Sequence, residues 1–158
     1  MKKNVLLTKL FCLFINIIIP VGLGALVGFL SGSSDGYKEL IQPSFAPPGI
    51  VFPIVWTILY TLMGISSYII KESDSSYRNT ALKTYYISLF INLLWSFLFF
   101  KFKLLLLSAL WILLLIYYVI KMIVQYYKIK KVASYLQLPY LLWLIFAFVL
   151  NITIYFLN

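Results

Sequence analysis

Five long apolar stretches alternate with short polar segments along the chain. Each is about 20 residues or longer, the length that an α-helix needs to cross the hydrocarbon layer of a membrane. A helix satisfies its own backbone polar groups, so runs of this length predict transmembrane helices. We place the spans near residues 5–30, 48–70, 82–100, 104–125 and 133–156. The pattern predicts an all-α membrane protein, a bundle of five transmembrane helices in a single domain over residues 1–158.

Composition supports this class and narrows the chemistry. Of 158 residues, 63% are hydrophobic and 11% are charged, against roughly 45–50% and 25% in soluble domains. The chain has no His, and its single Cys12 lies inside an apolar run. The commonest acid–base group and metal ligand are therefore missing, and no intramolecular disulfide can form. We expect no metal site and no required cofactor.

The charge balance of +9 comes from 13 Lys and Arg against 4 Asp and Glu. The basic residues lie between apolar runs and form no long stripe, which favours an anionic lipid surface over nucleic acid as the partner. Ten of the 13 fall on the amino-terminal side of five alternating spans. The positive-inside rule then predicts a multi-pass protein, in the cell membrane, with its amino terminus inside and its carboxyl terminus outside.

The first stretch has a second interpretation, because Lys2 and Lys3 precede an apolar run as they do in a signal peptide. A run of about 26 residues without a clear A-x-A cleavage site argues against it. The same stretch carries Gly24, Gly28 and Gly32 at spacings of four, a ridge suited to close helix packing inside the bundle or in a dimer. The sequence does not decide between these two uses.

The connections differ in length. Residues 31–47 form a long segment with both signs of charge and turn residues, which we expect to fold over one membrane face. Residues 101–103 are so few that the third and fourth spans must form an antiparallel hairpin. Pro20, Pro53 and Pro139 are expected to interrupt their spans, since each removes a backbone hydrogen bond.

Polar residues inside the spans are neutral, so the spans lack the charged side chains that proton pumps and ion channels use. Asn92 and Asn151 are expected to hydrogen-bond between helices, with direct ligand contact as the alternative.

The tryptophans do not lie where an aromatic belt at the membrane interfaces would place them. Trp56 and Trp143 lie toward the middle of their spans, as does Trp111. Flat aromatic, small and amide side chains recur at spacings of three and four in three spans: Phe52, Trp56 and Tyr60; Asn92, Trp95, Ser96 and Phe99; and Tyr140, Trp143, Ala147 and Asn151. Such stripes suit a pocket for a flat, mostly apolar ligand, and tight helix packing is the alternative.

Three blocks of sequence stand out. The first runs from PSFAPPG at 43–49 through VWTILY at 55–60 to Met63-Gly64. The others are NLLWS at 92–96 with Phe99-Phe100, and LPYLLW at 138–143 with residues 146–151. Together these blocks closely resemble the TspO/translocator protein family of tryptophan-rich sensory proteins, which is related to the peripheral benzodiazepine receptor.

This resemblance implies a five-helix bundle, commonly a homodimer, with a pocket near the first loop for porphyrins such as protoporphyrin IX. By motif position, Trp56 and Trp143 match the pocket tryptophans linked to porphyrin breakdown. The ligand-binding residues that the stripes and the resemblance together indicate are Tyr37, Pro47, Trp56, Tyr60, Asn92, Trp95, Ser96, Phe99, Trp143, Ala147 and Asn151.

Two departures from the family pattern change the expectation. Phe45 stands where the family's first loop usually carries a Trp, so an indole contribution from that loop is lost. No basic residue follows Tyr155, so the sterol motif fails and cholesterol is not expected as a natural ligand.

Three functions remain open from the sequence. The leading one is a receptor or scavenger of porphyrins, with Lys38 as a candidate partner for the propionates. The second is an enzyme that promotes light- and oxygen-dependent porphyrin degradation, with Trp56 and Trp143 in a redox role and without a metal or the usual acid–base residues. The third is a transporter of porphyrins or other apolar small molecules.

Overall fold

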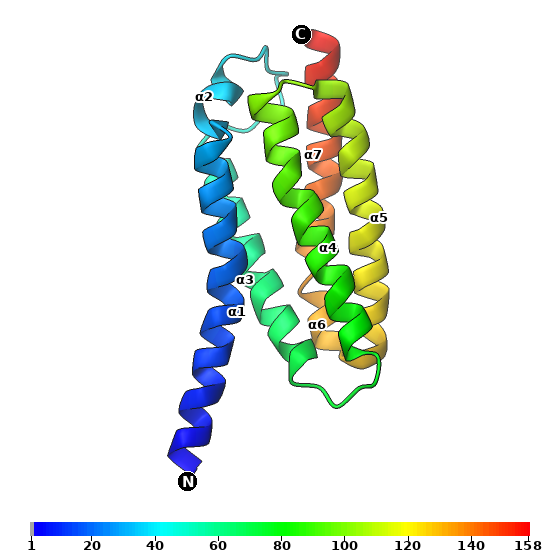
Figure 1. The fold of residues 1–158 in the computed structure, drawn as a ribbon. Coiled ribbons are helices and arrows are strands. Elements are labelled where there is room, and N and C mark those ends of the chain that lie inside the picture. The colour runs from blue at the N-terminus through cyan, green and yellow to red at the C-terminus, as the bar shows by residue number, and fades with distance from the viewer. Residues whose placement is uncertain (1) are drawn as a thin grey trace.

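The structure is a computed structural model that describes the backbone of residues 2–158 and the side chains of residues 6–33 and 35–158. In that part of the chain every regular element is helical (Figure 1). The elements are α1 (Lys2–Leu30), α2 (Ser33–Lys38), α3 (Val51–Lys71), α4 (Arg78–Ser96), the π-helical turn η1 (Phe97–Lys101), α5 (Leu105–Ile129), α6 (Lys131–Tyr135) and α7 (Leu138–Leu157).

Five helical segments of the described chain are long and apolar enough to cross a membrane, as the hydrophobic pattern predicts. The protein is therefore a multi-pass integral membrane protein. The fourth span, α5, continues to Ile129, four residues beyond the predicted end at residue 125. The last span is divided, because the short α6 and a turn precede α7. The third and fourth spans form the expected antiparallel hairpin, which reverses at Lys103 with a left-handed φ of 52°.

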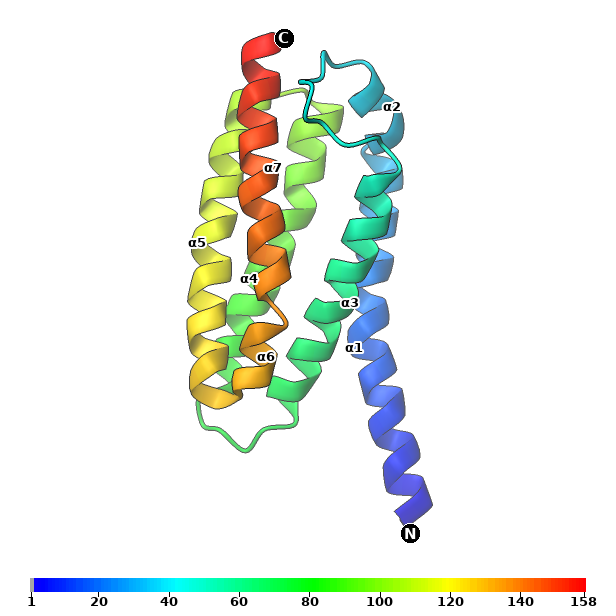
Figure 2. The ribbon, with the colours of Figure 1, turned by 180° about the vertical axis from the view of Figure 1, so that it is seen from behind.

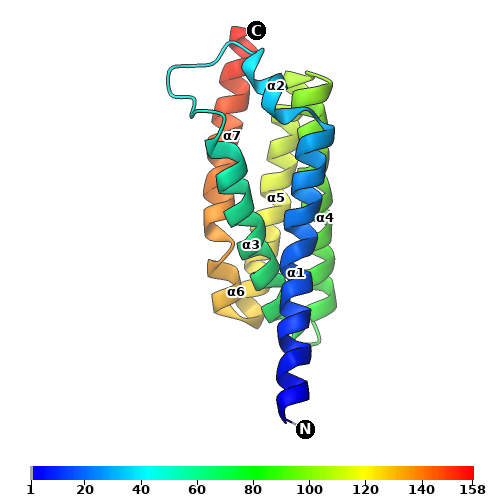
Figure 3. The same ribbon diagram turned by 90° about the vertical axis from the view of Figure 1, so that its left-hand side faces the viewer.

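The helices pack in the order α3, α1, α4, α5, α7 around the bundle (Figures 1 and 3). The α1–α3 contact depends on two glycines. A Cβ on Gly24 would overlap the ring of Tyr60, and one on Gly64 would lie 2.5 Å from the carbonyl oxygen of Asn16 and 2.6 Å from the Cα of Ile17. Of the predicted glycine ridge, only Gly24 serves close helix packing. Gly32 instead lies in the turn between α1 and α2, directly before α2, with a left-handed φ of 67°.

The predicted interruption at Pro53 is wrong, because Pro53 lies in the first turn of α3. The predicted interruption at Pro139 is confirmed: the last span breaks between α6 and α7, and Pro139 lies in the first turn of α7 directly after the break. The first turn of a helix has backbone N–H groups without helical partners, so proline costs little there. Pro20 does lie inside α1, as expected.

Helices α3 and α7 stand on either side of a wide separation, and few of their backbone atoms come close (Figure 2). The chain between α2 and α3 crosses the end of the bundle above this separation (Figure 3). Large side chains from both helices bridge it. The candidate site lies here.

Candidate functional site

The end of the site is closed by Tyr37 in α2. Its side chain is buried, with 4% exposed, and its hydroxyl donates a hydrogen bond to the Pro47 carbonyl oxygen at 3.2 Å. Its ring meets the Phe52 ring edge-on at 4.8 Å between centroids. Burial raises the pKa of the Tyr37 hydroxyl, which keeps it a neutral donor. One residue thus ties the loop before α3 to the top of α3.

Ring contacts continue from there across the α3–α7 separation. Phe52 contacts Trp143 at 5.9 Å between ring centroids, and Trp56 contacts Tyr140 at 6.2 Å, both edge-on. Trp56 also stacks on Tyr60 at 5.3 Å. We call these five residues, with Tyr37, the aromatic site. Two tryptophans predicted from separate spans therefore each take part in a ring contact across the same α3–α7 separation.

Helix α4 and turn η1 supply the neighbouring wall. Trp95 stacks on Phe99 at 5.2 Å, and both are buried together with Ala147 of α7. Trp56 packs against this cluster as well as against the core around Tyr60 and Tyr140. The structure therefore brings Trp95, Phe99 and Ala147 beside the aromatic site, as the stripes predict.

The four tryptophans divide by the use of their indole N–H groups. Trp95 donates to Asn151 Oδ1 at 3.2 Å, and Trp111 donates to the Ile91 carbonyl oxygen at 2.9 Å. Neither Trp56 nor Trp143 has an indole hydrogen bond with any side chain or backbone atom that the structure describes in full, and both are half-buried. Trp95 and Trp111 thus form hydrogen bonds between helices, while the indole N–H groups of Trp56 and Trp143 are able to donate a hydrogen bond to a ligand.

The side-chain amide of Asn151 makes three hydrogen bonds to neighbouring helices. Its Oδ1 accepts from Trp95 and from the Ser108 hydroxyl at 3.0 Å, and its Nδ2 donates to the Leu105 carbonyl oxygen at 2.9 Å. These bonds join α4, α5 and α7. This is the interhelical role expected for Asn151, and its direct ligand contact remains a prediction.

Asn92 and Ser96 flank Trp95 on α4. Asn92 is buried, and within the described chain its Nδ2 makes no hydrogen bond of good geometry. Its polar neighbours are the hydroxyls of Tyr60 and Tyr140, and the Tyr140 hydroxyl likewise makes no such bond. Ser96 is partly exposed. A buried amide N–H without a well-made bond is costly, so Asn92 is suited to donate to a polar edge of a ligand.

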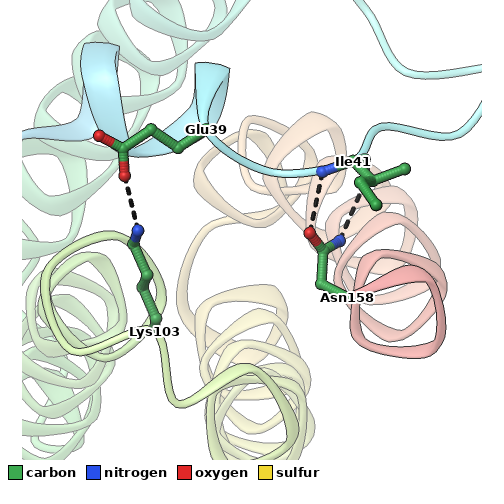
Figure 4. A network of polar contacts seen from close by, with 4 residues as sticks. All are labelled: Glu39, Ile41, Lys103 and Asn158. Carbon is green, nitrogen blue, oxygen red and sulfur yellow. Dashed lines mark hydrogen bonds and ion pairs between the residues drawn. The ribbon is translucent and has the colours of Figure 1, made fainter.

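Besides the Tyr37–Pro47 bond, two further contacts hold the loop over the site (Figure 4). Glu39 accepts a hydrogen bond and ion pair from Lys103 Nζ at 2.6 Å. Asn158 accepts from the Ile41 N–H at 2.9 Å and donates to the Ile41 carbonyl oxygen at 3.1 Å. The Lys103 hydrogen bond, and then its charge, lower the pKa of the Glu39 carboxyl.

Lys38, the cation expected near the site, pairs instead with Asp35 in its own helix, at 3.6 Å. Lys103 reaches the same loop from the turn between η1 and α5, which lies beside α2, so Lys38 and Lys103 both lie at the rim. Among the residues described, no group of His, Cys, Asp and Glu has a metal-binding arrangement. The site's chemistry is therefore aromatic, with a few hydrogen-bond donors and a cationic rim.

Phe52 and Tyr140 were in the predicted stripes but not among the predicted ligand-binding residues. The signal was present: Phe52 lies four residues before Trp56, and Tyr140 three before Trp143. Lys103 had no such signal, because only the path of the loop brings Glu39 to it.

Comparison with known proteins gives a consistent result. The profile of the TspO/MBR family matches residues 16–157. A tryptophan-rich protein TspO from Archaeoglobus fulgidus is 37% identical over 145 residues, covering 90% of this chain and 94% of the relative. One from Chlorobaculum tepidum is 33% identical over 154 residues, covering 91% and 96%. A tryptophan-rich sensory protein from Cereibacter sphaeroides is 33% identical over 93 residues, covering 59% and 58%. The chain belongs to the TspO/MBR family.

Proposed function

We propose that this protein is a membrane receptor or scavenger for porphyrins of the protoporphyrin IX type and for other flat, largely apolar ligands, which bind at the aromatic site. One observation carries the proposal. Trp56 of α3 and Trp143 of α7 meet ring-lined surfaces across the same helix separation, beneath one loop, and their indole N–H groups have no partner in the described structure.

Burial of apolar surface supplies the affinity. A tetrapyrrole that loses several hundred Å² of apolar surface to the site gains roughly 5–10 kcal/mol at about 25 cal/mol per Å², before ordering costs. Aromatic side chains match the flat face of the macrocycle and lose little conformational entropy on binding. Affinity therefore needs no metal contact from the protein.

Polar groups would orient the ligand. Its carboxylates would point toward Lys38 and Lys103 at the rim, because these are the cations nearest the loop. The indole N–H groups of Trp56 and Trp143, with the amide of Asn92, would meet acceptors on the macrocycle edge. A flat hydrocarbon without such edges should bind more weakly.

The ligand enters by separating rings that touch in this structure. Centroid distances of 5.9 Å and 6.2 Å are those of direct edge-on contact, so no third ring fits between them. Binding must widen the α3–α7 separation or lift the loop that Tyr37, Glu39 and Ile41 hold down. We infer that the structure is the closed form of the site.

Titration of detergent-purified protein with protoporphyrin IX, followed by tryptophan fluorescence, tests the proposal. Ala147→Leu adds bulk beside Trp95 and Phe99, and overpacking of this kind should weaken binding about tenfold. Val149→Leu, on the exposed side of the same helix, is the matched control and should bind as the wild type does. Equal affinity for all three proteins would remove the site from this position.

Two further expectations remain proposals. We propose a homodimer, to be tested by cross-linking in liposomes. We also propose that the protein lies in the cell membrane with its amino terminus on the inner side and its carboxyl terminus on the outer side. Cysteines introduced at Ser33 and Ser75 would be labelled from outside and protected, respectively, and the opposite pattern would reverse the orientation.

A further inference from the structure

The last span is broken between α6 and α7, toward the end of the bundle opposite the loop over the aromatic site (Figures 1 and 2). Two serines join the broken segment to its neighbours. Ser66 of α3 donates to the Ala133 carbonyl oxygen at 2.7 Å, and Ser134 of α6 donates to the Ile123 carbonyl oxygen of α5 at 3.0 Å. Irregular backbone at membrane depth is stable only where protein or water satisfies its polar groups.

Gln137 lies in this break, directly before α7, and its side chain is fully buried. Within the described chain neither its Oε1 nor its Nε2 makes a hydrogen bond. A side-chain amide can donate two hydrogen bonds and accept two. Burying it without any of them is costly, so the Gln137 amide requires a polar occupant beside it.

Two tyrosine hydroxyls near Gln137 are also unpaired. Tyr140 lies three residues after Gln137, and Tyr126 lies three residues after Ile123, the residue that Ser134 binds. Both side chains are at most 1% exposed, and among the described residues neither hydroxyl makes a hydrogen bond of good geometry. Both interact electrostatically with the Tyr85 hydroxyl of α4. The two hydroxyls therefore lie in the same part of the core.

Small side chains surround these groups and leave room beside them. Buried serine and alanine residues of α3, α4 and α6, each at most 2% exposed, occupy this depth of the bundle: Ser66, Ser67, Ser88, Ala133 and Ser134. Each of the four serine hydroxyls donates to a backbone carbonyl oxygen, so each oxygen keeps lone pairs that can accept a hydrogen bond. Buried space with polar walls holds water, whereas space that stays empty has apolar walls.

We propose that ordered water binds in the core of the bundle at the α6–α7 break, held by Gln137, Tyr126 and Tyr140. A buried water makes about three hydrogen bonds to groups that otherwise lack partners, and the amide with the two hydroxyls offers that number. The Tyr140 ring contacts Trp56 at the aromatic site, while its hydroxyl binds the water. The water therefore supplies the aromatic site with a polar floor. The proposal does not depend on the ligand of that site.

Nuclear magnetic resonance of the ¹⁵N-labelled protein, in micelles of deuterated detergent, tests the proposal. We expect cross-relaxation between water protons and the side-chain NH₂ group of Gln137. Asn151 is the matched control, because it is 1% exposed, its Nδ2 donates to the Leu105 carbonyl oxygen, and it lies beside the Ser108 hydroxyl. Relay through an exchanging hydroxyl proton would therefore show at Asn151 too, and we expect no signal there.

Two results of this measurement would overturn the proposal. One is the absence of a water signal at Gln137. The other is an equal signal at Gln137 and Asn151, which would report general entry of solvent into the bundle. The measurement uses the wild-type protein, so it decides the matter whether or not a variant folds.

Gln137→Met gives a second test, because methionine has a similar length and no amide. If water is bound, the substitution removes one of its partners and weakens its hold on the hydroxyls of Tyr126 and Tyr140. We expect unfolding in SDS to become roughly fivefold faster. Leu136→Met, at the neighbouring partly buried position, conserves volume and should stay within about twofold of the wild type. In a dry core, methionine in place of an unpaired amide would slow unfolding. That result, or equal rates for the two variants, would contradict the proposal.

Discussion

Trp95 donates its indole N–H to Asn151 Oδ1 at 3.2 Å and thereby joins α4 to α7 beside the aromatic site. The same oxygen accepts from Ser108 of α5, so three helices meet at one buried amide. This junction fixes one wall of the site. On the opposite side, Phe52 and Trp56 of α3 contact Trp143 and Tyr140 of α7 through their rings, and within the described chain no hydrogen bond joins these two helices. The α4–α5–α7 side is therefore held by hydrogen bonds, whereas the α3–α7 side is able to open.

Replacing Asn151 with Leu should destabilise the fold by about 1–2 kcal/mol, because the Trp95 N–H loses its acceptor in an apolar interior. Reversible unfolding in SDS would measure this. Thr153→Val is the control, since the Thr153 hydroxyl bonds only the Val149 carbonyl oxygen of its own helix. A destabilisation no larger than that of Thr153→Val would show that the junction contributes nothing.

The two closely packed glycines give a second prediction. Gly64→Ala places a methyl group against the α1 backbone at Asn16 and Ile17, and should cost about 1–3 kcal/mol in unfolding free energy. Gly22→Ala meets nothing within 4 Å, so it should be neutral or stabilise by up to about 1 kcal/mol through helix propensity. Thermal unfolding followed by circular dichroism compares them, and equal effects would contradict the α1–α3 packing.

The Glu39–Lys103 ion pair predicts a pH dependence of the loop. The pKa of Glu39 is lowered by Lys103, so the pair holds the loop above the ordinary carboxyl pKa and releases it as pH falls through the lowered value. A spin label at Ser44 should gain mobility below about pH 4.

Two variants control that measurement. Glu39→Gln should leave the label mobile at every pH. Asp35→Asn removes a pair confined to α2, so the transition should stay where it is in the wild type. A transition that survives in Glu39→Gln would assign the pH dependence to another group.

We predict that the proposed porphyrin degradation is separable from the proposed porphyrin binding. If Trp56 and Trp143 supply or relay electrons to a light-excited porphyrin, Trp56→Phe with Trp143→Phe should keep most of the affinity, because phenylalanine is also flat and apolar, and should slow bleaching of porphyrin absorbance in light and oxygen. Trp111→Phe controls for the loss of a tryptophan elsewhere. Bleaching at the wild-type rate in the double variant would end the redox role.

Much of the fold was predictable from the sequence, because run length alone distinguishes a membrane span from a buried helix. The span ends were less so. Pro139 marks the break in the last span, as expected, whereas Pro53 lies in the first turn of α3. A proline in the first turn starts a helix, and the hydrophobic pattern does not locate that turn.

For the site, the sequence predicted which side chains share a face of each helix, but not how the helices pack together. The stripes placed Trp56 and Trp143 on their faces, but which faces meet depends on α1, whose packing against Gly64 sets the position of α3. The reach of Lys103 to Glu39 depends on the left-handed residue at the α4–α5 turn and on the path of a 12-residue loop. Neither has a periodic signature.

The most direct measurement follows the indole N–H signals of the four tryptophans in ¹⁵N-labelled protein during titration with protoporphyrin IX. The macrocycle's ring current shifts nearby protons strongly. We predict large shifts for Trp56 and Trp143 and small ones for Trp95 and Trp111, whose N–H groups stay bonded to Asn151 and Ile91. Small shifts for Trp56 and Trp143, with binding still observed, would contradict the account.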